Sequence, residues 1–177
     1  MQLPSGSGPA RPATVLTFVH RYKACLTFFW RKYPHPSQIR SYFPEVNFSS
    51  ENITALINYY TALRKYYFDT MEAMARAALA SGITSAEEID LRPENEEIVS
   101  LLAFFDPLKT QCQPDEFLEE VGIVVKRFFE TIQKGEDASE GWKKSIYKIV
   151  SGREMDVPAW LHYEDFMEYA QVDRPIR

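Results

Sequence analysis

The run of residues from 52 to 80 constrains the fold more than any other part of the chain. Its apolar residues recur every three or four positions, which predicts one long amphipathic α-helix. Ser49 or Ser50 suits the N-cap and Gly82 suits a left-handed C-terminal end, so the helix measures roughly 45 Å. The expected buried stripe comprises Ile53, Leu56, Ile57, Tyr60, Leu63, Tyr67, Met71, Met74 and Ala78, and the opposite stripe comprises Thr54, Asn58, Thr61, Ala62, Lys65 and Asp69. One face therefore belongs to a core, and the other is free for a partner.

The remaining segments also show helical spacing, with no alternating strand pattern and no internal repeat, so the expected fold class is all-α. Prolines open and close two helices before the long one, and a capping box begins at Ser85. The further helices are expected at 14–32, 36–43, 94–105, 114–134 and 142–150, followed by a short amphipathic tail from Pro158 through Phe166 and Tyr169.

Charge divides the chain into two parts. Residues 1–82 hold nine Lys/Arg against four Asp/Glu, whereas residues 83–177 hold eleven against twenty-one. This indicates either two solvated surfaces of different sign, or a basic module able to meet phosphates beside an acidic one. An apolar content of 45% supports a sizeable core, and no run approaches the ~18 apolar residues of a membrane span. The Gly-, Ser- and Pro-rich start predicts a disordered linker at residues 1–13.

Enzymatic and metal-binding signals are absent from the sequence. The three histidines, His20, His35 and His162, have no Cys or Ser partner at a diagnostic spacing. Cys25 and Cys112 are isolated, which favours reduced thiols in an intracellular protein over a disulfide or a zinc site. We therefore expect no catalysis, no metal, no cofactor and no small-molecule substrate.

The long helix is the best candidate for a binding site. In a helix-turn-helix arrangement its free face would present Asn58, Thr61, Ala62 and Lys65 to the base edges of double-stranded DNA. Candidate phosphate contacts are Arg31, Lys32, Arg40 and Arg64, joined by Lys143 and Lys144 if that cluster lies on the same side. The alternative is an ordinary amphipathic helix with a solvated face.

Several blocks of residues carry a resemblance to a known family: LTFFWRKYP at 26–34, SYFPEVNF at 41–48, the aromatic-rich run at 59–71 and GWKKSIYKIV at 141–150. Across about residues 16–170 the chain resembles the homeo-prospero domain of Prospero-type transcription factors. The resemblance implies a three-helix homeodomain at 14–82, with an extended third helix, packed as one unit against a helical prospero domain at 83–177.

The resemblance also implies a nuclear location. The family's first helix holds an export signal masked by the C-terminal part, and the matching segment here contains Leu26, Phe28 and Phe29. If that signal is kept, the protein shuttles with the cytoplasm.

The family's base-contacting positions hold different residues in this chain. The family places a lysine on the third helix, an asparagine four residues on and a glutamate three beyond, where this chain has Asn58, Ala62 and Lys65. Asp69 adds a negative charge to the same face. Three functions stay open. They are a DNA-binding module with altered or weakened readout, a protein-interaction module that has lost specific DNA binding, and a helical scaffold that only packs within a larger protein.

Overall fold

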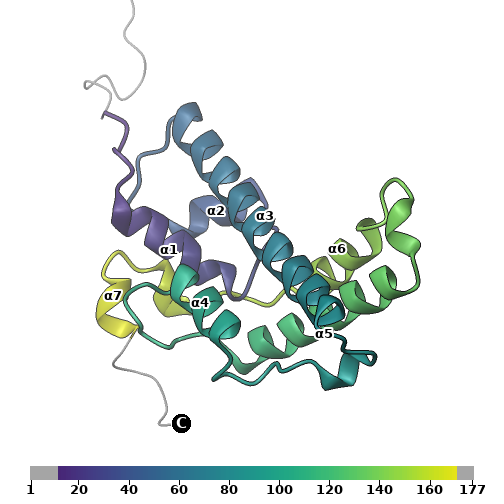
Figure 1. The fold of residues 1–177 in the computed structure, drawn as a ribbon. Coiled ribbons are helices and arrows are strands. Elements are labelled where there is room, and N and C mark those ends of the chain that lie inside the picture. Colours follow the sequence, from purple (N-terminus) through teal and green to yellow (C-terminus); the bar gives the residue numbers. More distant parts are fainter. Residues whose placement is uncertain (1–11, 171–177) are drawn as a thin grey trace, which may run out of the picture.

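The computed structural model describes residues 12–170, which fold into α-helices and short 3₁₀ turns without any strand (Figure 1). The all-α prediction is confirmed for this part of the chain. Residues 1–11, most of the expected linker, and residues 171–177 lie outside the described residues. The helices are α1 (Phe18–Phe28), α2 (Pro36–Tyr42), α3 (Ser50–Ala80), α4 (Glu96–Phe105), α5 (Asp115–Gln133), α6 (Lys144–Ser151) and α7 (Phe166–Tyr169), and the 3₁₀ turns are η1 (Ala86–Glu88), η2 (Glu136–Ala138) and η3 (Ala159–His162).

Helix α3 runs through the whole molecule and closely matches its prediction. Its N-cap is Ser49, whose Oγ accepts a hydrogen bond from the Asn52 amide at 3.1 Å. Gly82 adopts the left-handed conformation expected after the helix, with φ of 93°. The buried stripe is confirmed with one exception, Ile57, whose side chain is 36% exposed.

Helix α1 begins later than predicted because Thr14 makes contacts outside the helix. The Thr14 amide donates to the Asn47 carbonyl at 3.1 Å, and its hydroxyl accepts from the Asn47 amide at 2.8 Å. The Asn52 side chain also donates to the Thr14 carbonyl at 2.9 Å. These contacts hold the chain before α1 against the turn that leads into α3, and they compete with a helical start at residue 14.

Helix α1 also ends earlier than predicted, at Phe28 instead of residue 32. The backbone amides of Lys32 and Tyr33 donate to the carboxylate of Glu154, at 2.9 and 2.7 Å, and not to helix carbonyls. The expected boundary is therefore wrong because a distant side chain supplies the hydrogen-bond acceptor.

The other helices differ from their expected ranges by one or two residues at an end. Helix α4 starts at Glu96 because the side chain of Asn95 caps it, accepting from the Glu97 amide at 2.8 Å. The capping box at Ser85 is confirmed, but it opens only the 3₁₀ turn η1. The tail after Pro158 forms η3 and α7.

Aromatic side chains from both halves of the chain form one cluster. Phe28 at the end of α1, the following Phe29 and Tyr67 of α3 belong to it. They meet Phe105 of α4 and Phe117 of α5. The ring centroids of Phe28 and Phe105 are 4.8 Å apart, as are those of Phe29 and Phe117. The segments before and after residue 82 therefore share a core.

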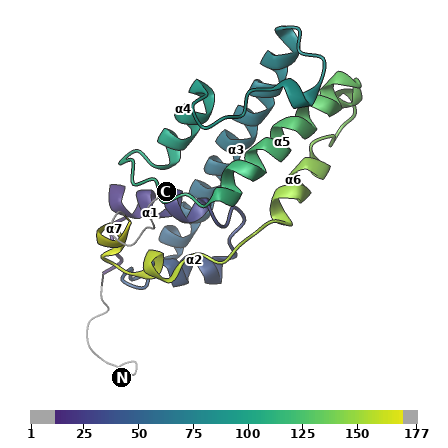
Figure 2. The ribbon, with the colours of Figure 1, turned by 90° about the horizontal axis from the view of Figure 1, so that it is seen from below.

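Helix α6 lies beside α5, as Figure 2 shows, and also reaches the second half of α3. The ring of Tyr147 packs against Phe68 with centroids 4.5 Å apart, and Lys143 Nζ lies 2.8 Å from Glu72 Oε1. No helix among residues 12–170 is long and apolar enough to cross a bilayer.

Candidate nucleic-acid interface

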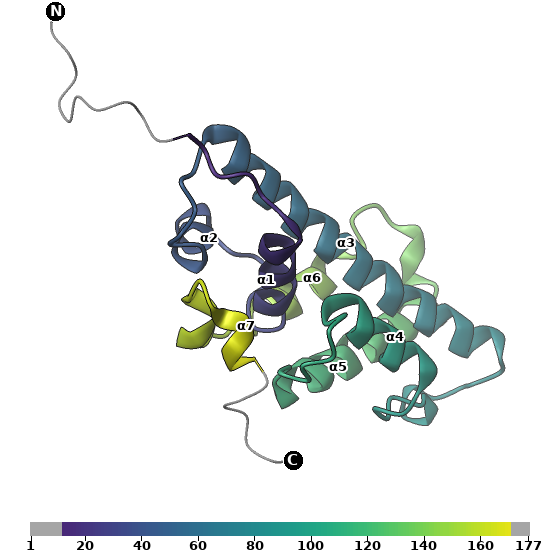
Figure 3. The ribbon, with the colours of Figure 1, turned by 90° about the vertical axis from the view of Figure 1, so that its left-hand side faces the viewer.

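Four predicted base-facing residues form what we call the outer face of α3: Asn58, Thr61, Ala62 and Lys65. All four are exposed. In Figure 3, α1, α2, α4 and α5 all lie on one side of the diagonal that α3 follows. The structure thus brings these residues together on a surface that none of those four helices covers, although base contact itself stays a prediction.

The polar side chains of the outer face differ in whether they already have a hydrogen-bond or ion-pair partner within the protein. Within residues 12–170, the side-chain amide of Asn58 has no hydrogen-bond partner. The ammonium of Lys65 lies 2.7 Å from the carboxylate of Asp69, one turn along the helix. The Thr61 hydroxyl donates to the Ile57 carbonyl at 3.1 Å and accepts from an Arg64 nitrogen at 3.1 Å. Asn58 is therefore the most available group for a new hydrogen bond.

Arg64, a predicted phosphate contact, is held against the protein. Its Nη1 donates to the Lys32 carbonyl at 2.8 Å, and its guanidinium lies 4.5 Å from the centre of the Tyr33 ring. Burial lowers the pKa of Arg64, and the nearby Tyr33 and Glu154 oppose that shift. The side chain is therefore held beside the outer face by a carbonyl, a hydroxyl and an aromatic ring.

Lys32, also predicted to contact phosphate, is buried with only 2% of its surface exposed. Its Nζ lies 3.2 Å from the carboxylate of Glu120, which also accepts from the Tyr67 hydroxyl at 2.6 Å. Burial lowers the pKa of Lys32, and the charge of Glu120 opposes the shift. The structure therefore removes Lys32 from the candidate phosphate contacts.

No local pattern marks Lys32 as a core residue, because its partner Glu120 is far away in the sequence. The one available signal is its position in an aromatic-rich run, directly after Trp30 and Arg31. Aromatic side chains predict burial nearby, but a lysine between them is normally assigned to the surface.

The two other arginines predicted to contact phosphate, Arg31 and Arg40, lie near the surface. Arg31 is half-buried, with a nitrogen 3.7 Å from the Asp156 carboxylate. Arg40 on α2 is exposed, with its guanidinium 5.2 Å from the Phe48 ring, and it makes no ion pair among residues 12–170. Arg40 is thus the more available cation for a phosphate.

The Lys143–Lys144 cluster does approach α3, as its phosphate role would require. Lys143 reaches Glu72, and that hydrogen bond raises the pKa of Lys143. Glu72 lies fourteen residues beyond Asn58, so this contact is roughly 20 Å along the helix from the start of the outer face. Lys144 is exposed and has no ion-pair partner in the described part of the chain.

Comparison with known proteins places this arrangement in a family. A family model described as "Homeo-prospero domain" matches residues 15–168. The chain belongs to the homeo-prospero domain family. It is 31% identical to Homeobox protein prospero homolog 1 of Caenorhabditis elegans over 88% of the chain and 26% of that protein. It is 34% identical to Prospero homeobox protein 2 of Mus musculus, over 84% of the chain and 25% of that protein.

A third relative, Homeobox protein prospero of Drosophila melanogaster, is 32% identical over 82% of the chain and 9% of that protein. This homeo-prospero domain therefore spans about a quarter or less of the length of these relatives.

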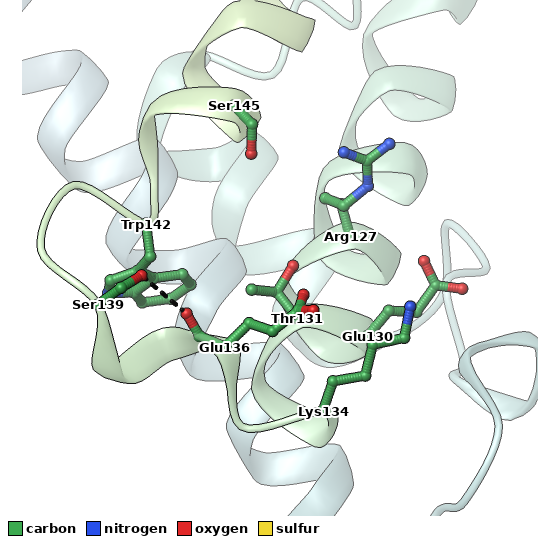
Figure 4. Close-up of a pocket in the computed structure, with 8 residues that line it drawn as sticks. All are labelled: Arg127, Glu130, Thr131, Lys134, Glu136, Ser139, Trp142 and Ser145. Atoms are coloured by element: carbon green, nitrogen blue, oxygen red, sulfur yellow. Dashed lines mark hydrogen bonds between the residues drawn. The ribbon is translucent and has the colours of Figure 1, made fainter.

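This homeo-prospero domain also has an open cavity of about 500 Å³ away from α3, between α5 and the segment that leads to α6 (Figure 4). Its lining mixes cations with anions and hydroxyls: Arg127, Glu130, Thr131, Lys134, Glu136, Ser139, Trp142 and Ser145. Segment 135–145 follows the helix α5, whereas the phosphate-binding loop of a nucleotide site follows a strand. The mixed lining favours no particular ligand.

Proposed function

We propose that this homeo-prospero domain is the DNA-binding module of a nuclear transcription regulator, and that α3 lies in the major groove with its outer face toward the bases. Residues 14–82 would act as the homeodomain-like part and residues 83–177 as the prospero-like part. The observation that carries the proposal is the outer face itself, exposed along α3 while α1 and α2 pack behind the same helix. Helix-turn-helix proteins present their recognition helix in this way.

The chemistry of the outer face favours an altered readout. The free amide of Asn58 can pair with the edge of an adenine, the methyl group of Ala62 can contact a thymine methyl, and Lys65 can donate to a guanine. These groups differ from the family's lysine, asparagine and glutamate. A different preferred sequence follows from that difference.

The electrostatics favour a modest affinity. Asp69 places a carboxylate 2.7 Å from the Lys65 ammonium, and it would also face the phosphates. With Lys32 buried and Arg64 held by the protein, the first half offers fewer free cations than its sequence suggests. Arg40 becomes the main candidate for anchoring the phosphate backbone.

The test is fluorescence-anisotropy binding of the full chain to random and Prospero-type duplexes, followed by selection of a preferred site. With four phosphate contacts, the affinity should fall about a hundredfold between roughly 50 and 200 mM salt. Asn58→Ala should cost about 1–3 kcal/mol of discrimination at the selected site. Arg40→Ala should make the salt slope shallower by about one and leave the sequence preference intact.

Lys134→Ala serves as the control, because this exposed lysine directly follows α5, away from the outer face, and should change neither the salt slope nor the sequence discrimination. Absence of binding at the lower salt concentration would contradict the proposal.

A second function is favoured by a groove between α3 and α4, which borders the outer face at Asp69. Two adjoining cavities of about 530 and 290 Å³ follow the helix from Tyr66 to Ser81 and are walled by α4 and by segment 83–95. The charged side chains that line them are all acidic: Asp69, Asp90, Glu96 and Glu97. Glu96 and Glu97 have no cationic partner in the described part of the chain. An acidic groove with an apolar floor suits a basic amphipathic peptide, and so supports the protein-interaction alternative.

A fluorescein-labelled amphipathic peptide with lysines on its polar face tests this alternative directly. The full chain should bind it more tightly than a counterpart carrying glutamate for lysine, and Glu96→Lys with Glu97→Lys should abolish the difference. Glu140→Lys, at an exposed acidic residue outside the groove, should retain it. Equal binding of both peptides to the unaltered chain would rule the groove out as a charge-selective site.

Shuttling belongs to the proposal as well. The side chains of Leu26, Phe28 and Phe29, in the segment that matches the family's export signal, are all fully buried. Such a signal would therefore act only after the surrounding core opens.

A further inference from the structure

The connection between α1 and α2, residues 29–35, lies between the outer face of α3 and the segment that follows α6. On one side, the Met155 amide donates to the Trp30 carbonyl at 3.0 Å. On the other side, Arg64 of α3 donates to the Lys32 carbonyl at 2.8 Å. A short piece of backbone thus contacts both the C-terminal segment and Arg64, which lies beside the outer face.

Glu154 holds this connection through two backbone amides. Its Oε1 accepts from the Tyr33 amide at 2.7 Å, and its Oε2 accepts from the Lys32 amide at 2.9 Å. Glu154 is half-buried, and burial raises the pKa of its carboxyl. Pro34 further restricts the backbone at Tyr33, since a residue before proline avoids helical angles.

The geometry of the peptide bond links the two sides. The Tyr33 amide and the Lys32 carbonyl belong to the same planar trans peptide unit, so they point in opposite directions. When Glu154 holds the amide, the carbonyl is aimed away from Glu154, and that is where Arg64 binds it.

Arg64 then fixes a residue of the outer face. Its Nη2 donates to the Thr61 hydroxyl at 3.1 Å, which leaves that hydroxyl to donate to the Ile57 carbonyl. Stacking of the guanidinium on the Tyr33 ring, at 4.5 Å, holds Arg64 in this position. The contacts form an unbroken path from Glu154 to Thr61.

We propose that Glu154 is a positioning residue for the outer face: it orients the Lys32–Tyr33 peptide, on which Arg64 docks and holds Thr61. Glu154 belongs to the prospero-like half and Thr61 to the homeodomain-like half. Through Glu154, the first of these therefore determines how the Thr61 hydroxyl donates and accepts hydrogen bonds on the outer face. The consequence for DNA rests on the proposed function. Without Glu154 the peptide is free to turn, Arg64 loses its carbonyl partner, and its charge becomes available to phosphate.

The first experiment requires no DNA. In NMR spectra of the full chain, Glu154→Ala should shift the Thr61 methyl and Arg64 Hε resonances and speed amide exchange at Tyr33 at least tenfold. Glu119→Ala is the matched control, because it removes the ion pair of the adjacent Arg153 (2.9 Å) without touching these backbone contacts. Glu154→Gln keeps one acceptor oxygen and should return the Thr61 resonance toward its original position.

Unchanged Thr61 and Arg64 resonances in Glu154→Ala would overturn the proposal. If that variant does not fold, Arg64→Lys tests the path from its other end. Lysine cannot bind the Lys32 carbonyl and Thr61 in the same planar geometry. Arg64→Lys should therefore shift Thr61 and quicken exchange at Tyr33, and a variant that alters neither would overturn the proposal equally.

DNA binding provides the second measurement. The Glu154→Ala chain should show a salt slope steeper by about one, for one added phosphate contact, together with weaker discrimination between sequences. A merely destabilised protein would lose affinity without a steeper slope. If the resonances shift but no DNA is bound by either chain, the positioning role stands and the proposed function fails.

Discussion

Replacing Glu120 with alanine should destabilise the fold by about 3–5 kcal/mol, because it leaves the buried Lys32 ammonium without its partner. The Tyr67 hydroxyl loses its acceptor in the same variant. Urea unfolding of the full chain measures this effect. The free energy of unfolding should fall, while its dependence on urea concentration stays the same.

The matched control is the exposed pair of Lys126 and Glu87, whose atoms are 3.1 Å apart. Glu87→Ala should cost no more than about 1 kcal/mol, as is typical of surface ion pairs. Replacing the three side chains together, with Lys32→Met, Glu120→Leu and Tyr67→Phe, should restore most of the lost stability, since the buried ammonium, carboxylate and hydroxyl are then all removed. A cost below 1 kcal/mol for Glu120→Ala would show that water reaches Lys32 and that the pair is not truly buried.

Neighbouring phenylalanines on α4 provide the second large effect. Phe105 is fully buried among Phe28, Phe29 and Phe117, so Phe105→Ala should cost about 3–5 kcal/mol through the cavity it leaves. For a domain of this size, that corresponds to a melting temperature lower by about 6–20 °C. The variant should loosen α1 as well as α4, because the cluster joins segments from both halves.

Phe104→Ala supplies an internal control with the same chemistry one residue away. Phe104 is 43% exposed and stacks on Tyr66 with ring centroids 3.7 Å apart, so its loss should cost roughly 0.5–1.5 kcal/mol for the aromatic pair. Equal costs for Phe104→Ala and Phe105→Ala, measured by thermal melts followed at 222 nm, would contradict the packing described for the junction.

Periodicity predicted α3 well because a helix of this length repeats its pattern over many turns, and local spacing decides which side is buried. The ends of α1 could not be predicted in the same way. Its start depends on contacts between Thr14 and Asn47, and its end depends on Glu154, which follows more than one hundred residues later. Boundaries set by tertiary contacts leave no local signal.

In the candidate site, too, local spacing predicted some features correctly, whereas features that depend on tertiary contacts were missed. Spacing alone placed Asn58, Ala62 and Lys65 together on one exposed face, and the structure agrees. Charge alone placed Lys32 and Arg64 among the phosphate contacts, but one is buried and the other is held by backbone and ring contacts. A sequence reveals which residues carry charge, whereas the availability of that charge depends on neighbours brought in by folding.

The arrangement of α3 has a consequence for how its specificity can change. The side chains that hold the two halves together and the side chains that we propose to meet a partner occupy opposite stripes of one helix. Substitutions at exposed helix positions usually alter stability by less than about 0.5 kcal/mol. The residues at positions 58, 62 and 65 can therefore be substituted, by mutation or by design, without loss of the fold. New recognition properties can then be obtained on the same helix.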